Sequence, residues 1–310
     1  MGWLGPGTDR PGLAADRAGR VDPVPGMIGA VATFIHLDDP ADPRLDDFRD
    51  LTLADRRPDR PGGRGLVIAE GVPVVRRLLD SPYPLRAVLG VPARVQALRV
   101  DLADVDAPAY VTTADVMAEV VGFHLNRGVL ATADRALMPP ASDLLRRATR
   151  VAVLEGVNDH ENLGALFRNA AALGIDAVLL GGRCADPLYR RSVRVSMGHV
   201  LRVPFAGLAP WPEALAELPA AGFQILAMTP APSAVDLGDV HAESLSKAAV
   251  LVGAEGPGLT EDALAAADLR VRIPMPTGVD SLNVATAAAL AFHHLQPRPA
   301  ANASRRHDRR

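Results

Sequence analysis

The sequence predicts an α/β protein with a small α/β domain over residues 51–140 and a larger domain, built on a parallel sheet, over residues 141–296. Three observations lead to this class. Short apolar runs alternate with amphipathic helical stretches from Leu66 onward. In the second half the apolar runs are unbroken, which is typical of parallel strands covered on both faces. A chain of 310 residues is also long enough for two hydrophobic cores.

The composition narrows the functional class. The chain is 48% hydrophobic and 22% charged, and it has no apolar run long enough to span a bilayer. Its first residues lack the compact apolar stretch of a signal peptide, so we expect a cytoplasmic protein. Cys184 is the only cysteine, which excludes an internal disulfide and a multi-cysteine metal site, and we expect no bound metal. The net charge of −3 does not by itself indicate a nucleic-acid partner.

The two ends of the chain differ from the middle. Residues 1–50 are rich in Gly, Pro, Asp and Arg with weak periodicity, and we expect a disordered leader there. Residues 297–310 read as a basic, disordered tail.

Between these ends, the pattern predicts the elements of both domains. In the first domain we expect a strand and a helix within 65–82, a strand at 85–92, a strand and a helix within 109–122, and a strand at 128–135. Residues 137–150 are predicted to form a linker and an entry helix. In the second domain the predicted strands are 151–157, 177–182, 200–205, 223–228, 248–253 and 269–274, and the helices lie near 162–173, 187–197, 211–221 and 260–267.

Ligands of parallel sheets collect at the carboxyl ends of the strands, so the residues that follow each strand are of most interest. After the first strand of the second domain, Asn162 begins a helix that Gly174 ends. Arg168 lies off the apolar stripe of this helix and is flanked one turn away by small residues, which permit close approach of a ligand. An ordinary surface arginine explains Arg168 equally well.

The segment after the second strand is strongly basic. Five arginines stand there with Asp186 as the only acid: Arg183, Arg190, Arg191, Arg194 and Arg202. A helix that begins near Pro187 would offer its N-terminal amides to a phosphate within this positive field. We favour anion binding over an ordinary cationic helix face.

Two further segments carry polar residues at strand ends. The loop LVGAEGPGL is neither a P-loop nor a dinucleotide-binding turn, but Glu255 within it indicates a bound group. In the segment 273–295, an alanine-rich helix follows a polar cluster, and Ser281 or Asp280 is expected to be its N-cap. Capping does not explain Asn283, which would lie in the first turn of an otherwise apolar helix.

Taken together, NLGALFRNA (162–170), LVGAEGPGL (251–259) and IPMPTGVDSLNVATA (273–287) resemble the three motifs of the SpoU/TrmH family of RNA 2′-O-ribose methyltransferases, in the SPOUT superfamily. The resemblance covers about 150–295. The first domain is more loosely similar to the N-terminal substrate-binding domain of many family members.

The resemblance implies a trefoil-knotted SPOUT domain, a homodimer, S-adenosylmethionine as cofactor and RNA as substrate. It assigns cofactor binding to Gly253, Ile273 and Leu282 and, less directly, to Met228, Thr229, Gly258 and Met275. It places catalytic and structural polar roles on Asn162, Arg168, Glu255, Ser281 and Asn283, with Glu255 anchoring Arg168 or loop amides. RNA contacts are expected at Arg183, Arg190, Arg191 and Arg194. Arg168 would assist the ribose 2′-hydroxyl, either as a base or by stabilising charge.

Other functions stay open at this point. One alternative is a non-catalytic RNA-binding module of the same fold, and another is a nucleotide-dependent enzyme suggested by GAEGPG. The extra N-terminal domain favours ribosomal RNA, 23S in particular, over transfer RNA as the substrate.

Overall fold

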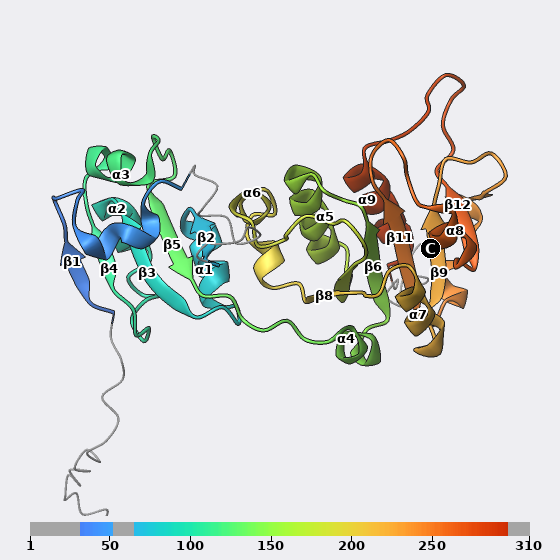
Figure 1. Cartoon of the computed structure of the whole chain (residues 1–310), viewed down its shortest axis with the longest axis horizontal. Coiled ribbons are helices and arrows are strands. Elements are labelled where there is room, and N and C mark those ends of the chain that lie inside the picture. Colours follow the sequence, from blue (N-terminus) through green and yellow to red (C-terminus); the bar gives the residue numbers. More distant parts are fainter. Residues whose placement is uncertain (1–31, 52–64, 297–310) are drawn as a thin grey trace, which may run out of the picture.

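Two sheets organise the protein, one in each half of the chain (Figure 1). The computed structural model describes residues 32–51 and 65–296. The predicted tail, 297–310, and residues 1–31 of the predicted leader lie outside the described residues. Residues 134–140 carry the chain from the first sheet to the second.

The first sheet has five strands in the order β1-β4-β3-β5-β2. The strands β1, β4 and β3 run parallel, and β5 is antiparallel to both β3 and β2. The strands are β1 (Phe34–His36), β2 (Val67–Glu70), β3 (Leu85–Gly90), β4 (Ala109–Val111) and β5 (Val129–Ala133). The helices are α1 (Val72–Leu79), α2 (Pro92–Ala97) and α3 (Ala114–Val121). Only β1 and α2 were not expected from the sequence.

The prediction that residues 1–50 are disordered is wrong for residues 32–50. Strand β1 pairs in parallel with β4, and the 3-10 helix η1 (Pro43–Phe48) buries Leu45 and Phe48 completely. These apolar segments are too short to show a period of their own, and the sheet edge supplies their partners. Residues 32–50 therefore pack with the first domain, which the sequence predicts to begin only at residue 51.

The second sheet has seven strands, and every pair of neighbours is parallel, as the unbroken apolar runs predict. Its order is β10-β12-β9-β11-β6-β7-β8. The strands are β6 (Arg150–Glu155), β7 (Ala177–Leu180), β8 (Phe205–Gly207), β9 (Gln224–Met228), β10 (Val235–Asp236), β11 (Ala248–Gly253) and β12 (Leu269–Arg272). The strand predicted at 200–205 begins only at Phe205, because residues 199–201 form the 3-10 helix η3 (His199–Leu201).

Helices cover both faces of this sheet. They are α4 (Ala141–Arg147), α5 (His160–Ala172), α6 (Arg190–Val195), α7 (Glu217–Ala220), α8 (Glu261–Ala265) and α9 (Val284–His294). Successive residues of a strand point to opposite faces. Accordingly, Leu154 of β6 lies in the cluster that contains α5 and α9, whereas Val153 lies in the cluster that contains α4, α7 and α8. Among the described residues, no helix combines the length and the apolar character needed to cross a membrane.

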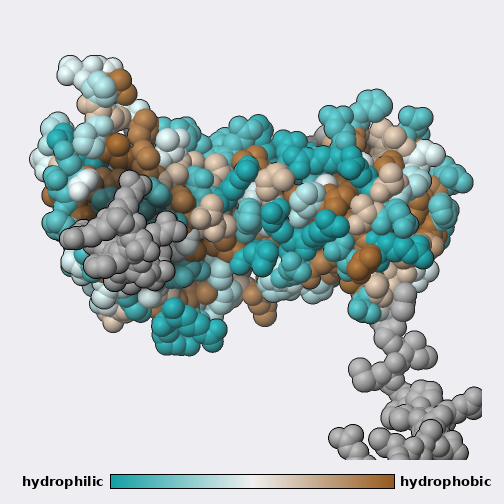
Figure 2. All heavy atoms as spheres, turned by 180° about the vertical axis from the view of Figure 1, so that it is seen from behind, coloured by the Kyte–Doolittle hydropathy of each residue, from teal (hydrophilic) through white to brown (hydrophobic). Residues whose placement is uncertain are grey.

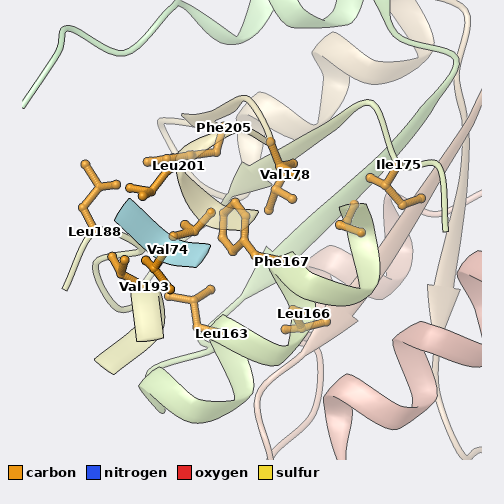
Figure 3. Close-up of a cluster of buried hydrophobic side chains, with 14 of the residues drawn as sticks. Val74, Leu163, Leu166, Phe167, Ile175, Val178, Leu188, Val193, Leu201 and Phe205 are labelled. Atoms are coloured by element: carbon orange, nitrogen blue, oxygen red, sulfur yellow. The ribbon is translucent and has the colours of Figure 1, made fainter. Parts of the chain in front are cut away.

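One hydrophobic cluster extends across both domains. Val74 of α1 packs among Leu163, Val193 and Leu201 of the second domain, as Figure 3 shows. Gly198 makes this approach possible, because a Cβ atom there would lie 3.0 Å from Val74 Cγ1 and its φ of +82° favours glycine. Arg77 Nη1 also donates to the Met197 carbonyl oxygen at 2.7 Å, so the first domain is docked by both apolar and polar contacts.

Candidate functional site

A cavity of about 490 Å³ lies at the carboxyl ends of β9, β11 and β12, beside the start of α9. This is the edge of the sheet where the sequence predicts ligand binding. All seven residues predicted to bind the cofactor line it: Met228, Thr229, Gly253, Gly258, Ile273, Met275 and Leu282. Glu255, Ser281 and Asn283 also line it, whereas Asn162 and Arg168 do not.

The segment between β12 and α9 projects from the body of the protein (Figure 1). In Figure 2 it stands at the upper left, with hydrophobic atoms gathered at its base. Val279 and Leu282 of this segment, and Val235 of β10, are large apolar side chains left exposed. Of these three, Leu282 lines the cavity, and an exposed apolar side chain at a concave site is typical of a surface that binds a ligand or another chain.

Glycine is required where β11 enters the loop 253–259. A Cβ atom on Gly253 would lie 2.4 Å from the backbone carbon of Gly258, because the loop closes on itself through an Ala254–Gly258 bridge. The φ angles of +87° at Gly256 and +71° at Gly258 are left-handed conformations that glycine adopts at little cost. This wall of the cavity is therefore backbone, which a ligand can approach closely.

Glu155, at the end of β6, holds the far end of this loop. The side chain is 2% exposed. Its Oε1 accepts from Trp211 Nε1 at 2.8 Å and from the Thr260 hydroxyl at 2.9 Å, and its Oε2 accepts from the Thr260 amide at 2.9 Å. Thr260 is in turn the N-cap of α8, since its hydroxyl accepts from the Ala263 amide. Sequence reasoning missed Glu155, although a carboxylate at the end of an apolar strand was the signal that singled out Glu255.

Asn283 connects three segments that are far apart in the sequence. Its Oδ1 accepts from the backbone amides of Ala285 and Thr286, so Asn283 itself is the N-cap of α9. Its Nδ2 donates to Asn162 Oδ1 at 2.7 Å and to Glu255 Oε1 at 2.8 Å. The prediction that Ser281 or Asp280 caps this helix is wrong, because the helix begins only at Val284, two residues later than a cap at Ser281 would require.

Helix α5 carries Asn162 and Arg168, and the structure differs from the prediction at both residues. Asp159 is the N-cap, accepting from the amides of Glu161 and Asn162, so Asn162 lies inside the first turn and not at its start. Arg168 is exposed and has no hydrogen bond or ion pair within the described part of the chain. The expected anchoring by Glu255 is not observed, since the contact that Glu255 makes is with Asn283.

The arginines predicted to bind RNA are only partly available. The side chain of Arg190 is 22% exposed and forms an ion pair with Glu70 at 3.6 Å. Its guanidinium also lies 4.7 Å from the centroid of the Phe123 ring. Burial lowers the pKa of Arg190, while the Glu70 carboxylate opposes that shift. Arg191 pairs with Glu161 at 2.5 Å, whereas Arg183 is exposed and Arg194 half-buried.

The predicted anion site at the start of α6 is also corrected. The helix begins at Arg190, three residues after Pro187, and has six residues. Asp186 instead accepts from the Leu188 amide and pairs with Arg135. Glu70 and Glu161, whose carboxylates offset the positive charge of this segment, come from other parts of the sequence. A prediction from the local sequence alone therefore does not include them.

No group of three or more His, Cys, Asp or Glu side chains able to hold a metal ion occurs within residues 32–51 and 65–296.

The chain is similar to known proteins over most of its length. The family model for the SpoU rRNA methylase family matches residues 149–293. An uncharacterised tRNA/rRNA methyltransferase of Mycobacterium tuberculosis is 59% identical over 267 residues, which are 84% of this chain and 93% of that protein. A 23S rRNA (guanosine(2553)-2′-O)-methyltransferase of Bacillus subtilis is 28% identical over 238 residues, covering 74% of this chain and 88% of that protein.

A solved structure has the same fold. The AdoMet-bound rRNA methyltransferase from Sinorhizobium meliloti superposes with a TM-score of 0.70 at 24% identity, over 84% of this chain and 97% of that one.

Proposed function

Because the chain belongs to the SpoU rRNA methylase family, we propose that it transfers a methyl group from S-adenosylmethionine to a ribose 2′-hydroxyl of RNA, with 23S ribosomal RNA as the substrate. The observation that carries the proposal is the hydrogen-bonded set of Asn162, Asn283 and Glu255. Each of these residues comes from a different one of the three motifs, and two of them line the cavity.

The cavity suits this cofactor in size and in chemistry. Its volume of about 490 Å³ lies within the range of small-molecule sites. Apolar side chains of Met228, Ile273 and Leu282 offer surface for an adenine ring, and the glycines of the loop 253–259 allow close approach to backbone groups. When bound, S-adenosylmethionine supplies an electrophilic methyl group on a sulfonium. The protein must then mainly position the ribose oxygen and help remove its proton.

Arg168 acts in the proposal as a cation. Arginine stays protonated in proteins, so a base role would require a state that its pKa disfavours. Its planar guanidinium can hold a phosphate with two parallel hydrogen bonds and stabilise the developing charge on the ribose oxygen. The absence of an ion-pair partner for Arg168 in the described part of the chain leaves the guanidinium available. Asn162, Glu255 and Asn283 hold the motif segments in register, and Ser281 lies at the cavity wall beside them.

A homodimer is part of the proposal. Leu290, on the outer face of α9, is 43% exposed, and α9 packs beside α5, which carries Arg168. A second copy would cover this apolar side chain and bring its own surface against the helix pair. Size-exclusion chromatography with light scattering measures the mass directly, and a wild-type mass of one chain would contradict the dimer.

The proposed function is tested by mapping 2′-O-methyl positions in cellular RNA. RNA from a deletion strain is compared with RNA from its parent for 2′-O-methyl positions, and purified protein is assayed with methyl-labelled cofactor. A site lost from 23S ribosomal RNA, restored by the purified protein, supports the proposal. A site lost from transfer RNA would overturn the proposed substrate, and failure to bind the cofactor in calorimetry would favour a non-catalytic RNA-binding module.

A further inference from the structure

The 3-10 helix η3 lies between α1 of the first domain and α5 of the second, with contacts to both. His199 begins η3, and Arg202 follows its last residue. Arg77 projects from α1, and its Cβ would lie 3.4 Å from a Cβ built on Gly198, the residue before η3. On the other side, α5 contacts η3, and Figure 3 shows Phe167 of α5 and Leu201 of η3 in the same apolar cluster. Arg168, the residue after Phe167, is exposed, and its guanidinium is close enough to His199 to lower the pKa of that imidazole. We refer to Arg77, Arg168, His199 and Arg202 as the basic cluster.

Positive charge in the basic cluster is poorly balanced. Arg77 donates to the carbonyl oxygens of Pro73 and Met197, and neither Arg77 nor Arg168 has a carboxylate partner within residues 32–51 and 65–296. Arg202 has Asp80 at 4.0 Å, and both side chains are more than half exposed. An exposed pair at this distance contributes little. The cluster is therefore an excess of guanidinium groups on a chain whose net charge is −3.

The pKa of His199 is sensitive to this excess of positive charge. Burial lowers the pKa of His199 below its ordinary value of 6.5, and the guanidiniums of Arg77, Arg168 and Arg202 lower it further. An anion bound among these groups would reverse the electrostatic part of that shift.

We propose that the basic cluster binds consecutive phosphates of the substrate RNA, on the strand that leads to the methylated ribose. Guanidinium groups match phosphate geometry, and phosphate contacts fix the register of an RNA without reading its sequence. The cluster includes Arg168, which the family motif places at the reaction, so the same strand would run from there to the first domain. Since Arg77 belongs to the first domain, this site exists only while the two domains are docked. The inference rests on the proposed function for the identity of the ligand.

Binding is measured by fluorescence anisotropy with a labelled oligouridylate, without cofactor, over a series of KCl concentrations. Each phosphate contact on a single strand contributes about 0.7 to the slope of log K against log salt. Arg202→Ala should lower that slope by about this amount and weaken binding at low salt several-fold. Arg202→Lys should restore the slope, since it keeps the charge. The matched control is Arg146→Ala, which removes one exposed arginine from α4 on an unrelated surface. An equal slope for Arg202→Ala and Arg146→Ala would overturn the proposal.

A second readout locates the ligand. The imidazole resonance of His199, assigned with His199→Gln, should titrate at a higher pH when oligouridylate is bound. An unchanged titration under saturating RNA would also overturn the inference. These outcomes can be distinguished from a failure of the proposed function. If the wild-type protein methylates RNA while Arg202→Ala binds RNA as Arg146→Ala does, only the proposed phosphate site is refuted. Wild type that binds through the cluster without transferring methyl groups refutes the enzymatic proposal alone.

Discussion

Asn283 donates from Nδ2 to Glu255 Oε1 at 2.8 Å while its Oδ1 caps helix α9. One side chain therefore fixes the start of the last helix and the loop after β11 at the same time. The second Nδ2 hydrogen bond, to Asn162, brings in the first turn of α5. Both amide hydrogens and the amide oxygen of Asn283 are used.

Substitution can separate the two roles of Asn283, capping α9 and bridging to Asn162 and Glu255. Asn283→Asp keeps an oxygen for the cap but loses both donors and places a carboxylate against Glu255, so methyl transfer should fall at least about tenfold, or about 1.4 kcal/mol. Asn283→Ala removes the cap as well and should cost about 1 kcal/mol of unfolding free energy in addition. Initial rates and thermal unfolding measure the two effects. Full activity in Asn283→Asp would show that the bridge to Asn162 and Glu255 is dispensable.

Gly253 should tolerate no side chain. In Gly253→Ala the new methyl group would overlap the backbone of Gly258 and displace the loop 253–259. We expect cofactor affinity, measured by calorimetry, to fall by about tenfold or more, since closely packed backbone cannot relax cheaply. Gly238→Ala is the matched control, because a Cβ there meets no atom within 4 Å. Equal affinities in the two variants would mean that the loop is free to move.

Glu155 is expected to act on the cofactor site through Thr260. In Glu155→Gln an amide donor replaces an acceptor among three donor contacts, which should cost about 1–3 kcal/mol of stability. If the loop is positioned by this anchor, KM for the cofactor rises more than kcat falls. Glu217→Gln, at an exposed position of α7, makes the same chemical change without a buried network. A parallel fall in kcat with unchanged KM would assign Glu155 to general stability alone.

The lowered pKa of His199 predicts a loss of stability in acid. Above about pH 8 the imidazole is neutral in both the folded and the unfolded chain and contributes nothing. As the pH falls through 6.5, the unfolded chain binds a proton that the folded chain resists, so the unfolding free energy decreases until the folded pKa is reached. His199→Gln should therefore lose less stability than wild type on acidification. Urea unfolding over this pH range tests it, with the exposed His293→Gln as control; identical curves for His199→Gln and wild type would contradict the prediction.

The sequence predicted the parts of this protein that depend on neighbours in the chain. Unbroken apolar runs such as AAVLVG are sufficient to identify parallel strands, and the residues that follow those strands necessarily meet at one edge of the sheet. That is why Met228, Gly253 and Ile273, which the family resemblance assigns to cofactor binding, line one cavity at this edge.

Features that depend on distant partners were not accessible from local patterns. The unbalanced charge expected around Arg190 and Arg191 disappears once Glu70 and Glu161 are brought beside them by the fold. Strand β1 gains its order from β4, which lies far along the chain. The N-cap of α9 was misplaced because Asp280, Ser281 and Asn283 are all good capping residues, and only the contact with Asn162 and Glu255 selects among them.

The position of Val74 has a consequence for how this protein can be divided. A fragment that begins at the linker, residues 134–140, would lack Val74. Leu163, Val193 and Leu201 would then form an exposed hydrophobic patch that other chains could contact. Such a fragment should aggregate, and a chimera carrying the first domain of a relative should behave no better unless Val74 and the glycine opposite it are matched. The first domain is thus not an accessory that can be exchanged freely, because its packing against the second domain depends on matched residues on both sides.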